Sequence, residues 1–154
     1  MRINDLIRLN PWWNDPSEIE NDSKVIEALS KSPAKTYSYT SLNNTILLGP
    51  RQVGKTTYLK LMIHHLIKHK VDPRCILYFS CELLERKSDI IDLINTYNNL
   101  FSNIPGFKYI LLDEITFVNN WEAAVKYLLD TWINKNNLLY VTGSSSIWLF
   151  KGYE

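Results

Sequence analysis

A glycine-rich loop between a short apolar run and an amphipathic segment constrains the fold of this chain more than any other feature. Residues 45–57 read TILLGPRQVGKTT, which contains the spacing G-x-x-x-x-G-K-T directly after a run with strand character. Residues from about 55 to 70 then carry apolar side chains at helical spacing. A strand, this loop and a helix in that order form the P-loop (Walker A) pattern, which binds phosphate through backbone N–H groups and the helix N-terminus. A glycine-rich turn that binds nothing is the alternative.

Each residue type in the loop has a chemical reason. Gly49 and Gly54 allow backbone conformations that a side chain would hinder, and they let the backbone approach a phosphate closely. Lys55 places a positive charge near the β- and γ-phosphates, and the Thr56 hydroxyl is a ligand for Mg²⁺. The residues predicted to bind the nucleotide are Gly49, Pro50, Arg51, Gln52, Val53, Gly54, Lys55, Thr56 and Thr57.

The rest of the chain alternates short apolar runs with amphipathic segments. Apolar runs at 75–80, 108–112 and 138–141 are predicted to be strands, with helices between them. Continuous apolar strands are typical of a parallel sheet that is covered by helices on both faces. The fold class is therefore predicted to be α/β with a parallel sheet.

Two acidic residues follow the third of these strands. Asp113 and Glu114 come directly after residues 108–112, where carboxylates are costly unless they meet a cation or solvent. With a P-loop upstream, we expect the cation to be Mg²⁺, held directly by Thr56 and through water by Asp113. Glu114 is predicted to polarise the water that attacks the γ-phosphate. The alternative is a strand that simply ends in polar residues at the surface.

Further motifs extend the pattern beyond the loop. The chain reads LNPWW at 9–13, GPRQVGKTT at 49–57, YILLDEI at 109–115 and TGSSS at 142–146, with Trp121 between the last two. Together these motifs resemble the ATPase domain of the prokaryotic AAA-type family with the GPRQVGKTT loop, and the likeness covers nearly the whole chain. The resemblance implies a three-layer P-loop NTPase sandwich with the strand order 5-1-4-3-2. It also implies that the domain binds and hydrolyses ATP.

The resemblance suggests a role for the serines that follow the fourth strand. In the family, a polar residue at this point contacts the γ-phosphate or the attacking water, which implies that role for Ser144. A cap for a helix at residues 147–150 is the alternative, and the two roles are compatible. The expected catalytic residues are therefore Lys55, Glu114 and Ser144.

The chain departs from the family at its end. It stops at Glu154, before the further helix, the fifth strand and the arginines that act on the γ-phosphate, so we expect a shortened member, natural or artificial. The remaining order 1-4-3-2 would leave the P-loop strand at an edge, where unpaired backbone groups promote strand exchange. We therefore expect the N-terminal part or a second copy of the chain to cover that edge. Because arginine contacts are worth about 10³–10⁵ in rate, hydrolysis is expected to be slow.

Residues 1–43 are predicted to form a helical arm ahead of a core at residues 44–154. One or both of the adjacent Trp12 and Trp13 are expected to bury against the core as an anchor. Alternatively, the arm walls the adenine pocket, since it immediately precedes the P-loop strand. Two tyrosines compete with the tryptophans for that role, Tyr37 and Tyr39.

Composition limits the other partners. A formal net charge of +1 gives no electrostatic case for nucleic acid or for a membrane surface. The apolar runs are too short for a membrane-spanning helix. Cys75 and Cys81 would lie about 20 Å apart in one extended strand, too far for a disulfide. Two unpaired cysteines fit a reducing, cytoplasmic compartment.

Two other functions use the same loop. One is a nucleotide-binding interaction module whose ATP state controls a partner without useful turnover. The other is a kinase of a small molecule, which usually needs an arginine-rich lid that this sequence does not contain. ATP, ADP and Mg²⁺ are the expected ligands in the favoured interpretation, an ATPase.

Overall fold

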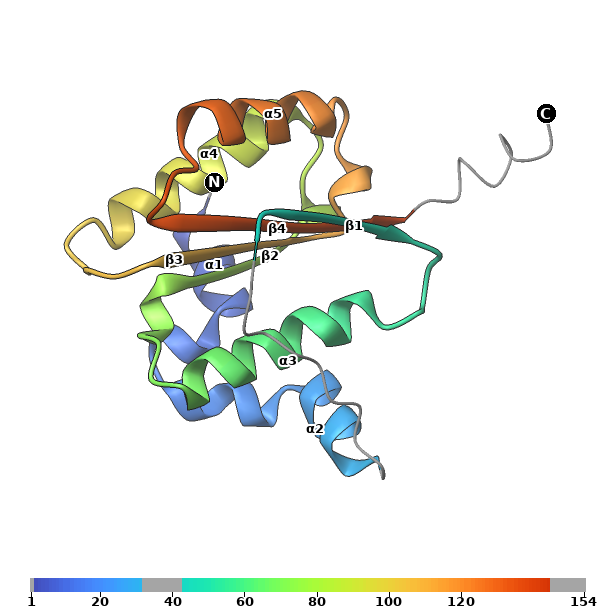
Figure 1. Cartoon of the computed structure of the whole chain (residues 1–154), viewed down its shortest axis with the longest axis vertical. Coiled ribbons are helices and arrows are strands. Elements are labelled where there is room, and N and C mark those ends of the chain that lie inside the picture. The colour runs from blue at the N-terminus through green and yellow to red at the C-terminus, as the bar shows by residue number, and fades with distance from the viewer. Residues whose placement is uncertain (1, 32–42, 145–154) are drawn as a thin grey trace.

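A parallel sheet of four strands forms the centre of the structure (Figure 1). The computed structural model describes residues 2–31 and 43–144, and the strand order in its sheet is β1-β4-β3-β2. This is the order that the family resemblance implied for the first four strands, so that prediction is confirmed. The strands are β1 (Thr45–Gly49), β2 (Ile76–Ser80), β3 (Lys108–Asp113) and β4 (Asn137–Ser144).

Helices cover both faces of this sheet and give the predicted three layers. Figure 1 shows α4 and α5 on one face, and α3 with α2 on the other. None of the described helices is long and apolar enough to cross a membrane. The α-helices are α1 (Ile3–Leu9), α2 (Ser23–Ser30), α3 (Lys55–Lys68), α4 (Lys87–Leu100) and α5 (Trp121–Thr131). Short 3-10 helices are η1 (Pro11–Trp13), η2 (Pro16–Asn21), η3 (Pro73–Cys75), η4 (Cys81–Leu83) and η5 (Ile115–Phe117).

Alternate residues along the strands divide the core into two apolar clusters. In β2, Leu77 and Phe79 pack with α4 and α5, whereas Ile76 and Tyr78 pack with α3. The continuous apolar run of this strand follows from that arrangement, because both of its faces are covered. Each fully buried large apolar side chain contributes about 1.5–3 kcal/mol to stability.

The register of the strands brings the predicted site together. Gly49 lies opposite Ser144 in the β1–β4 pair, and Ser80 lies opposite Asp113 in the β2–β3 pair. All four strands are parallel, so their carboxyl ends meet at one edge of the sheet, where α/β proteins bind their ligands. The P-loop and the acidic pair therefore leave the sheet on the same side.

The N-terminal arm wraps around the outer edge of β2. Leu6 of α1 belongs to the cluster with α4 and α5, whereas Ile19 and Val25 belong to the cluster with α3. Between them, the buried Asn10 side chain donates to the carbonyl of Tyr78 at 2.8 Å and accepts from the N–H of Tyr78 at 2.7 Å. Asn10 thus satisfies the edge of β2 as a neighbouring strand would.

The paired tryptophans complete this edge contact. The indole nitrogens of Trp12 and Trp13 both donate to the carbonyl of Ile76, at 3.2 and 2.8 Å, and Trp12 is only 1% exposed. The prediction that they anchor the arm is confirmed. The expectation that the arm covers the β1 edge is wrong for its described residues, which lie along β2 instead. Self-association through β1 stays a prediction.

Replacing Asn10 by leucine should lower the free energy of unfolding by about 2–4 kcal/mol. Leucine is similar in size but leaves the buried N–H and C=O of Tyr78 without these partners, and each such group costs about 1–3 kcal/mol. Chemical denaturation of both chains measures the difference. The exposed Asn14 provides the control, since Asn14→Leu should change stability by less than about 0.5 kcal/mol. Equal losses in the two variants would contradict the role given to Asn10.

Candidate functional site

The P-loop runs from the end of β1 to the first residue of α3. Gly54 has a φ of 99°, a left-handed conformation that favours glycine, as the sequence predicted. Gln52 is also left-handed, with a φ of 62°, which costs about 1–2 kcal/mol in a residue other than glycine. Gly49 does not have this conformation, and a Cβ atom added there would meet its nearest neighbours only at 3.9–4.0 Å. The predicted requirement for a backbone conformation that favours glycine is therefore met at Gly54, whereas Gly49 does not adopt such a conformation.

The ammonium group of Lys55 lies inside this loop. Its Nζ donates to the carbonyl of Gly49 at 2.8 Å and to the carbonyl of Pro50, and the residue is 7% exposed. An ammonium group has three donors and no acceptor. The loop carbonyls therefore hold the Lys55 ammonium group at the point where the motif requires a phosphate contact. A phosphate oxygen could replace either carbonyl as the acceptor.

The carboxylate of Asp113 accepts hydrogen bonds from three hydroxyl groups. Thr56 and Tyr78 each donate to Oδ2 at 2.7 Å, and Thr142 donates to Oδ1. Asp113 is 2% exposed, and a buried carboxylate is stable only when its oxygens have partners of this kind. These bonds join the first turn of α3, β2 and β4 to the end of β3.

Tyr78 is a partner of Asp113 that the sequence did not reveal. Burial, and then the neighbouring Asp113 charge, raise the pKa of the Tyr78 phenol well above its ordinary value, so it remains a donor at neutral pH. The ammonium of Lys60 lies 4.2 Å from the centre of the Tyr78 ring and 2.9 Å from an oxygen of Asp22, which caps α2. A continuous set of contacts therefore connects Asp113 with the arm.

Glu114, which directly follows β3, lies beside Ser144, the last residue of β4. The Ser144 hydroxyl donates to a Glu114 carboxylate oxygen at 3.3 Å, and the Glu114 N–H donates to the Thr142 hydroxyl at 3.2 Å. Glu114 has a left-handed φ of 54°, which turns the chain from β3 into η5. Within η5, the Thr116 hydroxyl accepts from the Ser144 N–H at 3.1 Å. The turn at Glu114 and the end of β4 are thus joined by three hydrogen bonds.

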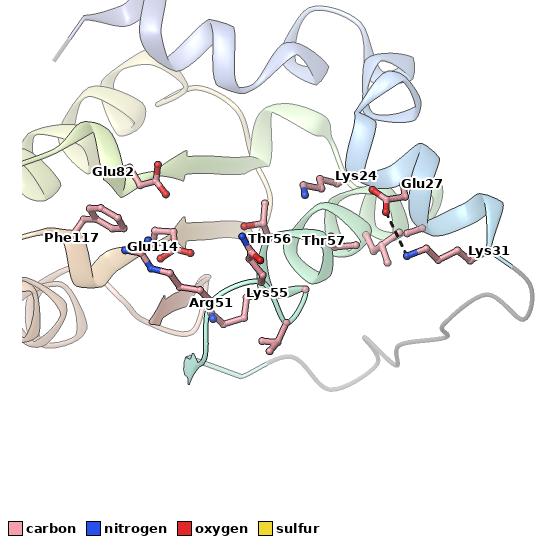
Figure 2. A pocket seen from close by; sticks show the side chains of 15 residues that line it. Lys24, Glu27, Lys31, Arg51, Lys55, Thr56, Thr57, Glu82, Glu114 and Phe117 are labelled. Atoms are coloured by element: carbon pink, nitrogen blue, oxygen red, sulfur yellow. Dashed lines mark ion pairs between the residues drawn. The ribbon is translucent and has the colours of Figure 1, made fainter. Parts of the chain in front are cut away.

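A cavity of about 700 Å³ lies over the P-loop (Figure 2), a size typical of small-molecule sites. Residues 51–57 of the loop and of the start of α3 line its middle. Figure 2 shows the α2 side chains and the side chains beyond β2 and β3 at opposite sides of the loop. The residues at these two sides are Lys24, Glu27 and Ala28 from α2 with Lys31 directly after it, and Glu82, Glu114 and Phe117 beyond the strands.

The structure brings most of the predicted site residues to this cavity. Seven of the nine predicted loop residues, 51–57, line it, and the other two supply the carbonyls that hold Lys55. Glu114 lines it as well, Asp113 lies against Thr56, and Ser144 contacts Glu114.

The arm also lines the cavity, but not through its tryptophans. Trp12 and Trp13 lie at the β2 edge, and neither is among the residues around this cavity. The wall is formed by α2 instead. The competing Tyr37 and Tyr39 lie outside the described residues, as do the serines that follow Ser144.

Sequence reasoning missed several residues of this site. Glu82 lies two residues beyond the end of β2, and Thr142 lies near the end of β4, so their positions at the carboxyl ends of parallel strands were an available signal. Tyr78 gave no such signal, because it lies inside an apolar run. Thr116 contacts β4 only because Glu114 turns the chain toward it.

The available donors fit a magnesium ion that is shared with phosphate. Thr56 and Asp113 supply oxygen atoms 2.7 Å apart, and Mg²⁺ prefers oxygen ligands. Within residues 2–31 and 43–144, no group of three or more His, Cys, Asp and Glu side chains could hold a metal ion. Mg²⁺ is commonly bound by one or two protein groups, water and substrate phosphates, and this donor set suits that mode.

A family model described as "AAA domain" matches residues 42–154. The chain belongs to this family. The match agrees with the predicted AAA-type P-loop fold, and the sheet order found in the structure is the order predicted for it. Nucleotide binding is the property that the family and the fold support together.

Two curated proteins of Methanocaldococcus jannaschii are similar to the chain. They are the uncharacterized protein MJ1637, 36% identical over 105 residues, and the uncharacterized protein MJ1544, 32% identical over 106 residues. The matches cover 66% and 69% of this chain but 21% and 22% of those proteins, so the chain spans about a fifth of their length. Among solved structures, a variant of RuvB from Thermotoga maritima matches with a TM-score of 0.42 and 12% identity, over 94% of this chain and 38% of that one.

Replacing Tyr78 by phenylalanine should lower the free energy of unfolding by about 1.5–3 kcal/mol. The variant keeps the ring but removes a donor to a carboxylate, and hydrogen bonds to charged groups are worth that much. Tyr97 provides a matched control, because its hydroxyl donates to the neutral carbonyl of Arg74 at 2.8 Å. Tyr97→Phe should cost only about 0.5–1.5 kcal/mol. Urea denaturation compares the two, and a smaller loss for Tyr78→Phe would contradict the role given to Asp113.

Replacing Gly143 by alanine should also destabilise the chain, by about 1–3 kcal/mol. A Cβ atom at this position would lie 2.5 Å from the methyl carbon of Thr116 and 3.1 Å from a methyl carbon of Leu48. Thr116→Ser removes the first contact and keeps the hydroxyl that binds the Ser144 N–H. Thermal denaturation should therefore show a smaller cost for Gly143→Ala in the Thr116→Ser background. An unchanged cost would show that the Thr116 contact is not its cause.

Proposed function

We propose that this chain binds Mg·ATP in the cavity over the P-loop and hydrolyses it to ADP and phosphate. The observation that carries the proposal is the meeting of Lys55, Thr56 and Glu114 around one cavity, with Asp113 bound to Thr56. A cation in a glycine loop, a hydroxyl at a helix start and an acidic pair at a strand end are the parts that phosphoryl transfer requires. A glycine-rich turn without a ligand would need none of these three parts.

The phosphates are assigned to the P-loop and the first turn of α3. Backbone N–H groups at this helix start attract anions. Lys55 would exchange its hydrogen bonds to the Gly49 and Pro50 carbonyls for bonds to phosphate oxygens, which are stronger because both partners are charged. Thr56 and Asp113 would hold Mg²⁺, which neutralises phosphate charge when it is bound.

The hydrolytic end of the cavity is assigned to Glu114 and Ser144. The Glu114 carboxylate would orient the attacking water toward the terminal phosphorus and take up the proton that the water loses. The Ser144 hydroxyl, which donates to Glu114 in the structure, would turn its single hydrogen to the terminal phosphate, or accept a hydrogen bond from the water. Catalysis would then consist of positioning and electrostatic stabilisation.

The other end of the cavity is assigned to the base and the ribose. With the phosphates on the loop, the space along α2 remains for the base and the ribose. Ala28 and Leu61 provide apolar surface there. Lys24 of α2 and Lys31, which directly follows this helix, add charged groups. This assignment keeps the hypothesis that the arm walls the adenine pocket and transfers the role from the tryptophans to α2.

Replacing Lys55 by alanine should weaken Mg·ATP binding by about 10–100-fold, the loss expected for one charge-assisted contact to phosphate. Isothermal titration calorimetry measures the change. Lys68→Ala is the matched control, because it removes the same charge from the exposed last residue of α3 and should leave the affinity unchanged. Equal effects of the two substitutions would contradict a specific phosphate contact.

Replacing Glu114 by glutamine should lower phosphate release by about 10²–10⁴-fold and leave Mg·ATP affinity nearly unchanged. The glutamine keeps the shape of the side chain but cannot accept a proton. Glu122→Gln, on the exposed side of α5, should keep the wild-type rate. If the wild-type chain binds Mg·ATP without releasing phosphate above background, the alternative of a nucleotide-binding interaction module is favoured instead.

A further inference from the structure

The geometry points to Arg51 as a catalytic arginine that this chain carries within its own P-loop, positioned by Phe117 to contact the terminal phosphate of ATP. This inference rests on the proposed function and adds to it a residue that contacts the γ-phosphate and not the diphosphate part. Such a residue would let the site distinguish ATP from ADP.

The side chain of Arg51 lines the cavity over the P-loop. Among the described residues, it is the one arginine that lines it. The sequence contains four others. Arg8 and Arg74 pair with Asp5 and Asp72, while Arg2 and Arg86 flank the starts of α1 and α4.

The guanidinium group of Arg51 is not committed to a carboxylate. No ion pair of Arg51 is found among the described residues, although Glu82 and Glu114 line the same cavity. Its contact is with the ring of Phe117, whose centre lies 5.5 Å from Cζ. A cation over an exposed aromatic ring is held weakly, so it remains available to a ligand of opposite charge.

Phe117 directs the arginine to one end of the cavity. Figure 2 shows the Arg51 side chain extending toward Phe117 and Glu114, away from the α2 residues on the other side. Phe117 is the last residue of η5, the short helix that begins directly after Glu114. The position of the aromatic ring and the position of the Glu114 carboxylate are therefore set by the same turn.

The bond from Ser144 to Thr116 stabilises this turn from the side of β4. Glu114, Ser144 and the ring that holds Arg51 thus form one connected unit at the end of the cavity assigned to hydrolysis. A guanidinium that leaves the ring there would reach the terminal phosphate before it could reach the base.

Arginine suits this contact chemically. Its planar guanidinium forms two parallel hydrogen bonds to phosphate oxygens, and these bonds are stronger than a contact with an aromatic ring. In hydrolysis, water adds to the terminal phosphorus while the bond to the bridging oxygen of ADP breaks. Arg51 gains and loses no atoms in this step; it stabilises the negative charge on the transferred phosphoryl group.

The test compares the affinities for a non-hydrolysable ATP analogue and for ADP, both with Mg²⁺, by calorimetry on the full 154-residue chain. Arg51→Ala should weaken binding of the analogue by about 10–100-fold and binding of ADP by less than about threefold. Arg51→Lys should fall between these values, since lysine keeps the charge but not the paired donors. Arg86→Ala is the control for loss of one positive charge and should change neither affinity.

Phe117→Leu provides an independent variant that leaves the arginine in place. It should weaken binding of the analogue severalfold without affecting ADP, because the arginine loses its support. In the wild-type chain, phosphate release should exceed that of Arg51→Ala by about 10³-fold.

The outcomes separate the two proposals. If the wild-type chain binds neither nucleotide, the proposed function itself fails. If it binds both and Arg51→Ala changes the two affinities equally or not at all, the proposed function stands and the role of Arg51 is overturned. An Arg51→Ala loss without any effect of Phe117→Leu would overturn the role of the aromatic ring.

Discussion

The burial of one carboxylate organises this structure. Asp113 lies almost out of contact with solvent, and its charge is compatible with that position because three hydroxyl groups donate to it. Removing a single partner of a buried charge is costly, so the elements that supply these hydroxyls are held in register. The start of α3, the middle of β2 and the end of β4 are thereby fixed around the end of β3. The P-loop, which leads into α3, is positioned by the same carboxylate.

Tyr78 makes the N-terminal arm part of this arrangement. Its backbone pairs with Asn10, its ring lies under Lys60, and its hydroxyl reaches Asp113. Lys60 in turn binds Asp22 at the start of α2, the helix that walls the cavity. The arm therefore contacts this group of residues at two points. Asn10 binds the edge of β2 at Tyr78, and Asp22 at the start of α2 binds Lys60. Its role in the fold and its role in the site are not separable.

The sequence predicted the parts of the site that depend on local pattern. The P-loop and the Asp113-Glu114 pair could be predicted because each stands at the end of a short apolar run, and the sheet order was available only through family resemblance. The edge covered by the arm could not be predicted, because Asn10 meets Tyr78 across 68 positions of the chain through backbone atoms that carry no sequence signal. Tyr78 itself looked like any apolar strand residue. The left-handed turn at Glu114, which places Thr116 and Phe117, was equally invisible, since glutamate rarely adopts that conformation.

Side chains of the arm occupy backbone groups at the outer edge of β2, which limits where another strand can join the sheet. An amide and two indoles occupy the carbonyls of Ile76 and Tyr78 and the N–H between them, so no further strand can hydrogen-bond there. Among the described strands, β1 is the other edge of the sheet, so an added strand would join there, next to the nucleotide-binding loop. Strand β1 would then take part in both events, because it would pair with the added strand and it leads directly into the loop that binds the nucleotide. As far as the described residues show, an assembly built on this domain by strand addition would form beside its phosphate site.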